Sequence, residues 1–166
     1  TVNENSITNP LSTYAKANLK AEKEVYKMKN KTFQVNVLRN STLFGFSQNL
    51  RLDLVINIFV NSYMRKNKIK VDGDGKQWRP FISLTDVAKI YKILIANETY
   101  PSFVTNLVSF NSTIRELAFK VIKHFKGSTN QIEFNIHNKD ARNYRTKSIN
   151  LKKYFKNLKF SNFNYE

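Results

Sequence analysis

A short alternating segment, a glycine-rich turn and a capped helix follow one another over residues 69–88, and this succession constrains the fold most. Apolar and polar residues alternate over 69–71 as in a strand, and residues 72–75 supply turn chemistry. Ser83 or Thr85 then suits the N-cap of a helix with apolar residues at a helical period. A strand followed by a helix is the unit from which α/β proteins are built.

Arg79 lies between that turn and that helix, directly after Trp78, which is the only tryptophan of the chain. A guanidinium held between a turn and a packed helix is well placed to clamp a phosphate or a carboxylate with two hydrogen bonds. The alternative is a surface arginine that stacks on Trp78.

The remaining sequence repeats the alternation of strands and helices. Further helices are predicted over 10–28, 54–66, 113–125, where Ser112 is the expected cap, and 148–155. Further strands are predicted over 33–38, 103–108 and 132–136. We therefore expect an α/β fold.

The charge balance is strongly basic, with 28 Lys and Arg against 12 Asp and Glu and a formal charge of +16. Such an excess favours anionic partners, although blocks of lysine also occur on solvated helix faces. The densest cluster, residues 139–159, has eight basic residues against Asp140 alone. This cluster either holds an anionic nucleotide or is a basic tail.

Several classes of site are not favoured. The chain has no cysteine, so no disulfide or thiolate metal site can form, and His124 and His137 lack a paired ligand spacing. No apolar run approaches the roughly 18 residues that a membrane span needs, and the polar residues 1–10 lack a signal-peptide pattern. We expect a cytoplasmic protein with neither a metal nor a membrane partner.

Four segments together resemble the extended short-chain dehydrogenase/reductase family of nucleotide-sugar epimerases, dehydratases and reductases. Residues 69–88 match its strand, Gly-Asp-Gly turn, arginine and helix with Asp-Val-Ala, and residues 10–22 look like its catalytic helix. Residues 38–45 look like its strand and loop toward nicotinamide and sugar, and residues 50–57 like the helix that follows. The resemblance runs over nearly the whole chain.

This resemblance implies the carboxy-terminal part of a Rossmann-type fold. Residues 1–50 are then the end of the nucleotide-binding fold, and residues 51–166 are the small α/β substrate-binding subdomain with returning strands. Family members are about twice as long, and their Gly-x-x-Gly-x-x-Gly turn is not found among the four glycines of this sequence. We expect that the chain begins in mid-fold and that this turn lies upstream of Thr1.

The resemblance assigns catalysis to Tyr14, which in the family moves a proton to or from a sugar hydroxyl. A phenol needs a neighbouring positive charge to do so at neutral pH, and the family places a lysine one helical turn later. That position is Asn18, which offers an amide without charge, while Lys16 and Lys20 lie on other faces of the helix. By residue type alone, Tyr14 is a half-buried aromatic.

Other positions match binding residues of the family. Asn40, together with Tyr14 and Asn18, is expected at the cofactor, which is NAD or NADP. The expected substrate contacts are Thr42, Asn57, Val71, Arg79 and Arg142, and the two arginines would reach the sugar diphosphate. Arg142 belongs to an Asp-x-Arg-x-Tyr stretch, residues 140–144. The alternatives are a loop hydroxyl at Thr42, a solvent-facing Asn57 and a core valine at Val71.

The leading hypothesis is an NAD(P)-dependent nucleotide-sugar epimerase, dehydratase or ketoreductase, present as its substrate-binding half. Its expected partners are a nucleotide-diphosphate sugar, a separate nucleotide-binding half and a second copy of the chain. The alternative is an inactive nucleotide-sugar-binding module, which Asn18 and the absent glycine turn favour. Nucleic-acid binding rests on charge alone and is not favoured, because no known binding motif occurs.

Overall fold

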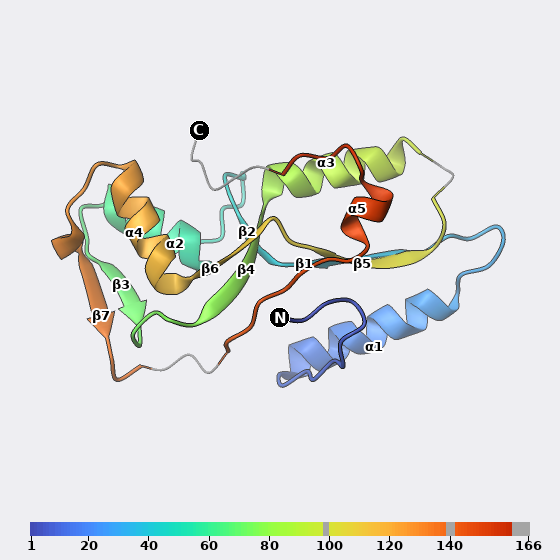
Figure 1. The fold of residues 1–166 in the computed structure, drawn as a ribbon, viewed down its shortest axis with the longest axis horizontal. Helices are drawn as coiled ribbons and strands as arrows, with labels where there is room; N and C mark the ends of the chain where they lie inside the picture. The colour runs from blue at the N-terminus through green and yellow to red at the C-terminus, as the bar shows by residue number, and fades with distance from the viewer. Residues whose placement is uncertain (98–99, 139–141, 161–166) are drawn as a thin grey trace.

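Helices and strands alternate along the chain in the computed structural model, which describes residues 1–97, 100–138 and 142–160 (Figure 1). The helices are α1 (Thr13–Lys27), α2 (Val55–Met64), α3 (Leu84–Ile95), α4 (Ile114–His124) and α5 (Leu151–Tyr154), with a 3-10 turn η1 (Thr129–Gln131). The strands are β1 (Asn36–Asn40), β2 (Thr42–Phe44), β3 (Ile69–Asp72), β4 (Trp78–Ser83), β5 (Phe103–Leu107), β6 (Phe110–Thr113) and β7 (Ile132–Asn135). The expected α/β fold class is confirmed.

The described strands form three small sheets. β1 and β5 are parallel, with Leu38 opposite Thr105. β4 lies between the parallel strand β2 and the antiparallel strand β6, and β3 and β7 form a second parallel pair. In a parallel pair both carboxyl ends reach the same edge, so the polar residues that end β1 and β5 come together.

Two hydrophobic clusters lie on either side of β4. Phe81 packs with α2, β3 and α4, whereas its neighbour Ile82 packs with α3, β5 and α5. Successive residues of a strand point to opposite faces, so Phe81 and Ile82 enter different clusters. Both side chains are fully buried. β4 is therefore packed on both faces and lies between the two hydrophobic clusters, which form the cores of the two halves of the molecule.

β4 was not predicted, and its sequence explains why. A strand that is buried on both faces lacks the alternation by which strands are recognised, and Pro80 argues further against a strand. Pro80 is tolerated because it lies in the part of β4 that pairs with β6 only, whereas β2 pairs with residues 81–83. Arg79 therefore lies on a strand, which fills the segment between the predicted turn and the predicted helix.

The helix caps agree with the sequence in one case and differ in the other. Ser83 caps α3 by accepting a hydrogen bond from Asp86 N at 3.0 Å. The cap of α4 is Thr113 and not the predicted Ser112, because Thr113 and Glu116 form a reciprocal capping box. Ser112 is buried in β6 and donates instead to the Glu116 carboxylate at 3.0 Å.

An irregular segment, residues 142–149, joins the two halves, and we call it the strap. The Tyr144 backbone donates to Trp78 O at 3.2 Å, and the Thr146 backbone donates to Asn111 Oδ1 at 2.8 Å. Val2 pairs with the strap from the other side in a parallel bridge to Thr146. The strap therefore connects β4, β6 and the amino-terminal segment.

The helices α3 and α5 cover one face of the β1–β5 pair, and α1 lies along the other (Figure 1). None of the residues of α1 is buried. Within the described residues, no helix combines the length and the apolar character that crossing a membrane requires.

Candidate active site

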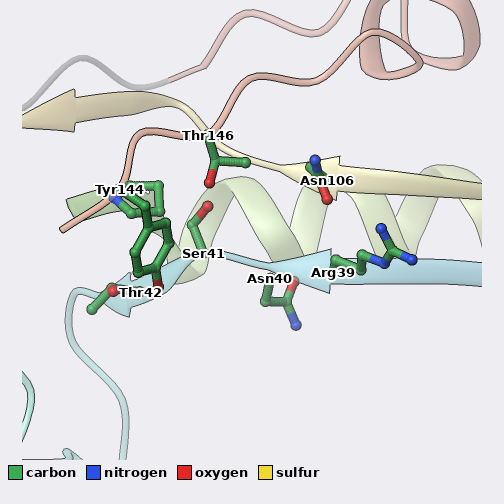
Figure 2. Close-up of a pocket in the computed structure, with 8 residues that line it drawn as sticks. Arg39, Asn40, Ser41, Thr42, Asn106, Tyr144 and Thr146 are labelled. Carbon is green, nitrogen blue, oxygen red and sulfur yellow. The ribbon is translucent and has the colours of Figure 1, made fainter. Parts of the chain in front are cut away.

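A cavity of about 340 Å³ opens at the carboxyl ends of β1 and β5, and we call it the first cavity. Figure 2 shows the end of β1 on one side and the strap with Tyr144 and Thr146 on the other. The lining residues, most of them polar, are Arg39, Asn40, Ser41, Thr42, Pro80, Asn106, Tyr144 and Thr146. Amides, hydroxyls and one aromatic ring thus converge at a strand-end position that commonly binds ligands.

Arg39, the only charged residue among the described residues that line the first cavity, is already paired. Its Nε and Nη2 donate to the Glu22 carboxylate of α1 at 2.9 and 2.6 Å. The hydrogen bonds to Glu22 raise the pKa of Arg39 against the effect of burial, and the charges of Glu22 and Glu4 act in the same direction. The positive charge of Arg39 is therefore balanced by two carboxylates.

Glu4 fixes the strap behind this cavity. Its carboxylate accepts hydrogen bonds from the Ser148 hydroxyl at 2.5 Å, from Asn106 N at 2.9 Å and from Ile149 N at 3.0 Å. Burial alone would raise the pKa of Glu4, but these hydrogen bonds outweigh burial and the pKa lies below its usual value. Glu4 is therefore held in its ionised form, which joins the strap to β5.

A second cavity, of about 300 Å³, lies between α2, β3 and the start of β4. The described part of its lining includes three cations and two carboxylates among apolar residues. The lining residues are Thr42, Asp53, Leu54, Val55, Ile58, Phe59, Lys70, Asp72, Gln77, Arg79, Ile114 and Arg142. Of the two carboxylates, Asp53 accepts from Arg51 at 2.5 Å and Asp72 accepts from Asn138 at 2.9 Å.

The backbone around Arg79 holds its guanidinium in place. Arg79 is only 6% exposed, and its Nη1 donates to Trp78 O at 2.7 Å and to the Arg142 carbonyl oxygen. The guanidinium also lies 5.6 Å from the centroid of the Tyr144 ring. Arg145 stacks on Trp78, at 3.5 Å from the ring centroid, and Arg79 is buried. The alternative of a surface arginine on Trp78 is wrong for Arg79.

Thr42 connects the two cavities, because it lines both of them at the start of β2. On the facing strand, Pro80 lines the first cavity and its neighbour Arg79 lines the second. Arg142 reaches the second cavity from the strap, so the structure brings both predicted arginines to one place. The first two residues of its Asp-x-Arg-x-Tyr stretch, Asp140 and Ala141, lie outside the described residues.

Tyr14 and Asn18 lie outside both cavities on α1, and Tyr14 is 77% exposed. The hydrogen bond to Asp53 is the largest cause that raises the pKa of Arg51, and Tyr14 is near enough to act in the same direction. Tyr14 therefore lies within electrostatic range of the Arg51–Asp53 pair, and Asp53 borders the second cavity.

Two predicted substrate residues have structural roles in this conformation. Val71 is fully buried in the core with Ile69, which favours the alternative of a core valine. Asn57 is half-buried and donates to Arg51 O at 2.9 Å, so it fixes the loop before α2 and does not line either cavity.

Residues 1–106 match the model of the NAD dependent epimerase/dehydratase family. The chain belongs to this family. The matched part includes Tyr14, β1, Arg79 and the strand end at Asn106, whereas the strap lies beyond it. The resemblance seen in the sequence is thereby confirmed.

One curated relative is the "Putative UDP-glucose 4-epimerase" of Methanocaldococcus jannaschii, which is 29% identical over 126 residues, or 74% of this chain and 40% of the relative. The fold is similar to that of dTDP-glucose 4,6-dehydratase from Bacillus anthracis in complex with NAD, with a TM-score of 0.77, 20% identity and coverage of 92% of this chain and 48% of that one. UDP-N-acetylglucosamine 4-epimerase from Methanobrevibacter ruminantium, in complex with UDP-N-acetylmuramic acid, gives a TM-score of 0.77 at 22% identity over 95% and 51% of the two chains.

The chain therefore has the Rossmann-type fold of extended epimerases and dehydratases, and it spans about half the length of the solved structures it matches. The division at residue 50 stays a prediction. In the structure, β1 shares its hydrophobic cluster with α3, β5 and α5, all of which follow residue 50.

Sequence reasoning did not identify Ser41, Asn106, Tyr144 and Thr146 of the first cavity or Lys70 of the second. Asn106 carried a usable signal, because it is a polar residue near the carboxyl end of a predicted strand. Tyr144 carried only its place at the end of the Asp-x-Arg-x-Tyr stretch, and Thr146 carried no signal. They lie in a segment without periodicity, and only its hydrogen bonds to β4 and β6 bring them to the cavity.

Proposed function

We propose that this chain is the substrate-binding portion of an NAD(P)-dependent nucleotide-sugar epimerase, dehydratase or ketoreductase. The observation that carries the proposal is the meeting of Arg79 and Arg142 at one cavity, with Lys70 from β3 beside them. Among the described residues, Lys70, Arg79, Arg142, Asp53 and Asp72 supply the charged groups of that cavity, and both carboxylates accept a hydrogen bond from another side chain.

A diphosphate suits this arrangement. Arginine presents a planar fork of donors that matches phosphate oxygens, and a guanidinium anchored by backbone carbonyls loses little freedom on binding. Arg79 is anchored in this way by Trp78 and Arg142. The apolar residues of α2, such as Ile58, would cover the nucleoside, and the sugar would extend past Thr42 into the first cavity.

The family uses NAD or NADP, and this chain offers only part of a site for it. Asn40 and Ser41 provide an amide and a hydroxyl at the end of β1, where the nicotinamide end would lie. The glycines stand at positions 45, 73, 75 and 127, and none of them forms a Gly-x-x-Gly-x-x-Gly turn for the pyrophosphate. When bound, the cofactor supplies the hydride chemistry, while Tyr14 would hold the proton of the sugar hydroxyl at its phenol oxygen.

The surface around β1 is suited to a nucleotide-binding half. Among the described strands, β1 pairs only with β5, which leaves its other edge open, and parallel sheets are normally covered on both faces. The adjacent helix α1 and the residues that flank it expose apolar side chains, among them Leu11, Val25 and Met28. A strand from the cofactor-binding half would pair with this edge, and a second copy of the chain is the other candidate for α1.

The second candidate function is a binding module without turnover, and Asn18 is the residue that favours it. The amide of Asn18 provides no positive charge to Tyr14, and Lys16 and Lys20 lie on other faces of α1. If Asn18 is the limiting defect, Asn18→Lys should yield turnover of UDP-glucose when a nucleotide-binding half and NAD are supplied.

Isothermal titration of the chain with UDP, UDP-glucose and NAD tests the proposal. We expect both uridine compounds to bind and NAD to bind weakly or not at all. Arg142→Ala should weaken UDP binding about tenfold, because a charge-assisted contact is lost. The matched control is Arg65→Ala, whose side chain contacts Asn61 on α2 and does not line either cavity. UDP binding that Arg142→Ala leaves unchanged would contradict the diphosphate assignment.

A further inference from the structure

Trp78, the only tryptophan of the chain, lies outside both cavities but contacts the strap, which carries Arg142. Trp78 is the first residue of β4 and pairs with Thr113 of β6, so the sheet fixes its backbone. Its partner on the strap is Arg145, which is also not among the described residues that line either cavity. The ring of Trp78 can therefore influence a ligand in the second cavity only through other residues.

The strap begins with four exposed residues, 142–145, and three of them contact Trp78. Trp78 N donates to Asn143 Oδ1 at 3.0 Å, and Trp78 O accepts from Tyr144 N at 3.2 Å. The guanidinium of Arg145 lies 3.5 Å from the centroid of the Trp78 ring. Trp78 thus holds the strap with its backbone nitrogen, its backbone oxygen and its ring.

The same backbone oxygen also holds Arg79. Trp78 O accepts from Arg79 Nη1 at 2.7 Å, and this guanidinium donates further to the Arg142 carbonyl oxygen. If the strap moved away from Trp78, the Arg142 carbonyl would leave Arg79 and the Arg142 side chain would leave the second cavity. The separation of the two arginines therefore depends on the attachment of the strap to Trp78.

The stack of Arg145 on Trp78 is the part of this attachment that depends on side chains alone. A guanidinium is planar and weakly hydrated, which suits it to the face of an aromatic ring. At an exposed site such a stack stabilises the bound arrangement by about twofold to fivefold in an equilibrium constant. It lies just before Thr146, the first buried residue of the strap, and so extends the fixed part of the strap toward Arg142.

We propose that Trp78 and Arg145 are positioning residues, whose stack fastens the strap so that Arg79 and Arg142 converge on a diphosphate. This inference rests on the proposed function, since it concerns the affinity of the second cavity for a nucleoside diphosphate. It differs from a direct attraction of the ligand by the charge of Arg145, because that attraction would not need the Trp78 ring.

A double-mutant cycle tests the inference, with UDP affinity measured by calorimetric titration of the unchanged chain, Trp78→Leu, Arg145→Ala and the double variant. Each single substitution should weaken UDP binding about fivefold. The double variant should also bind about fivefold more weakly than the unchanged chain, because the loss of either partner already releases the strap. Independent effects that multiply to about 25-fold, or single variants with unchanged affinity, would overturn the inference.

Further variants separate the stack from loss of folding and from loss of charge. Trp78→Phe keeps an aromatic face, so its UDP affinity should stay within about twofold of the unchanged chain. Lys29→Ala is the control for charge, because Lys29 lies 3.9 Å from the ring centroid of Tyr26, and neither residue is among the described lining of the cavities. It should leave UDP affinity unchanged. If Arg145→Ala weakens UDP binding and Trp78→Leu does not, the charge of Arg145 acts on the ligand directly and the inference is wrong.

The fluorescence of the single tryptophan reports on the stack without any ligand. Arg145→Ala uncovers the Trp78 ring, so its emission should move to longer wavelength, whereas Lys29→Ala should leave the emission unchanged. An unchanged spectrum of Arg145→Ala would contradict the stack. If UDP does not bind to the unchanged chain, the proposed function fails together with this inference. If Arg142→Ala weakens UDP binding but Arg145→Ala and Trp78→Leu do not, only the positioning role is overturned.

Discussion

Arg39 and Glu22 join β1 to α1 through two parallel hydrogen bonds of 2.9 and 2.6 Å, with both side chains less than a third exposed. Because α1 has no buried residue, this ion pair is a principal attachment of the helix to the sheet. The same helix carries Tyr14. The position of the proposed proton donor therefore depends on a contact that also sets the charge of the first cavity.

Removal of this pair should loosen α1. Glu22→Ala leaves a partly buried guanidinium without its partner, and we expect the free energy of unfolding to fall by about 1–3 kcal/mol. Amide hydrogen exchange of α1 should accelerate more than that of α4. Glu24→Ala is the control, because the Glu24 carboxylate is exposed and pairs with the exposed Lys27 on the same helix. Equal exchange rates in the two variants would contradict this role of Arg39.

Glu4 should make stability depend on pH in a defined direction. Its pKa in the folded chain lies below the usual value near 4.5, so its ionised form stabilises the fold above that pH, and this contribution is lost as the pH falls through the folded pKa. Glu4→Gln should therefore reduce stability by about 1–2 kcal/mol at pH 7 and by less at pH 3. Denaturant unfolding of the unchanged chain and of Glu4→Gln at several pH values measures the difference between their free energies of unfolding. If this difference does not change with pH, the charge of the Glu4 carboxylate does not contribute to stability.

Gly75 and Gly73 form a matched pair in the turn between β3 and β4. Both have positive φ, at +71° and +67°, but a Cβ at Gly75 would lie 2.9 Å from Val71 Cγ1 and from Arg115 Cβ. A Cβ at Gly73 would meet only Asn138 O, at 3.5 Å. We expect Gly73→Ala to lower the free energy of unfolding by about 1 kcal/mol and Gly75→Ala to lower it by about 2–4 kcal/mol. Only Gly75→Ala adds a steric clash to the backbone strain. If thermal unfolding shows similar losses of stability in the two variants, the predicted clash of a Cβ at Gly75 with Val71 and Arg115 is ruled out.

The cap of α4 gives a smaller and more local prediction. Thr113→Ala removes the acceptor for Glu116 N and half of the capping box, which should cost about 1 kcal/mol of unfolding free energy. Thr85→Ala should cost less, because Ser83 and not Thr85 caps α3. A larger loss at Thr85 would mean that the assignment of the two caps is incorrect.

Local pattern predicted much of the fold. β3, the turn after it, α3 and α4 were found from alternation, turn residues and helical periodicity, and each has a clear amphipathic or capped boundary. β2, β4 and β6 were missed. β4 is buried on both faces and contains Pro80, and β2 and β6 are only three and four residues long, too short for a periodic signal.

The site was predictable where a strand end or a family position pointed to it, as at Asn40, Thr42 and Arg79. In the strap, only Arg142 was predicted. Hydrogen bonds to segments more than 30 residues away in sequence place Thr146, because Asn111 Nδ2 donates to Thr146 O and Thr146 N donates to Asn111 Oδ1. Val71 and Asn57 show the converse. Their positions match the family, yet this structure gives them a core contact and a loop contact.

The structure of the chain in complex with UDP-glucose tests the central claim most directly. We predict the diphosphate between Arg79 and Arg142, within hydrogen-bond distance of both guanidinium groups, and the glucosyl ring beyond Thr42 in the first cavity. A complex with the diphosphate on the basic segment of residues 142–159 outside the second cavity, or with the sugar outside the first cavity, would contradict the account.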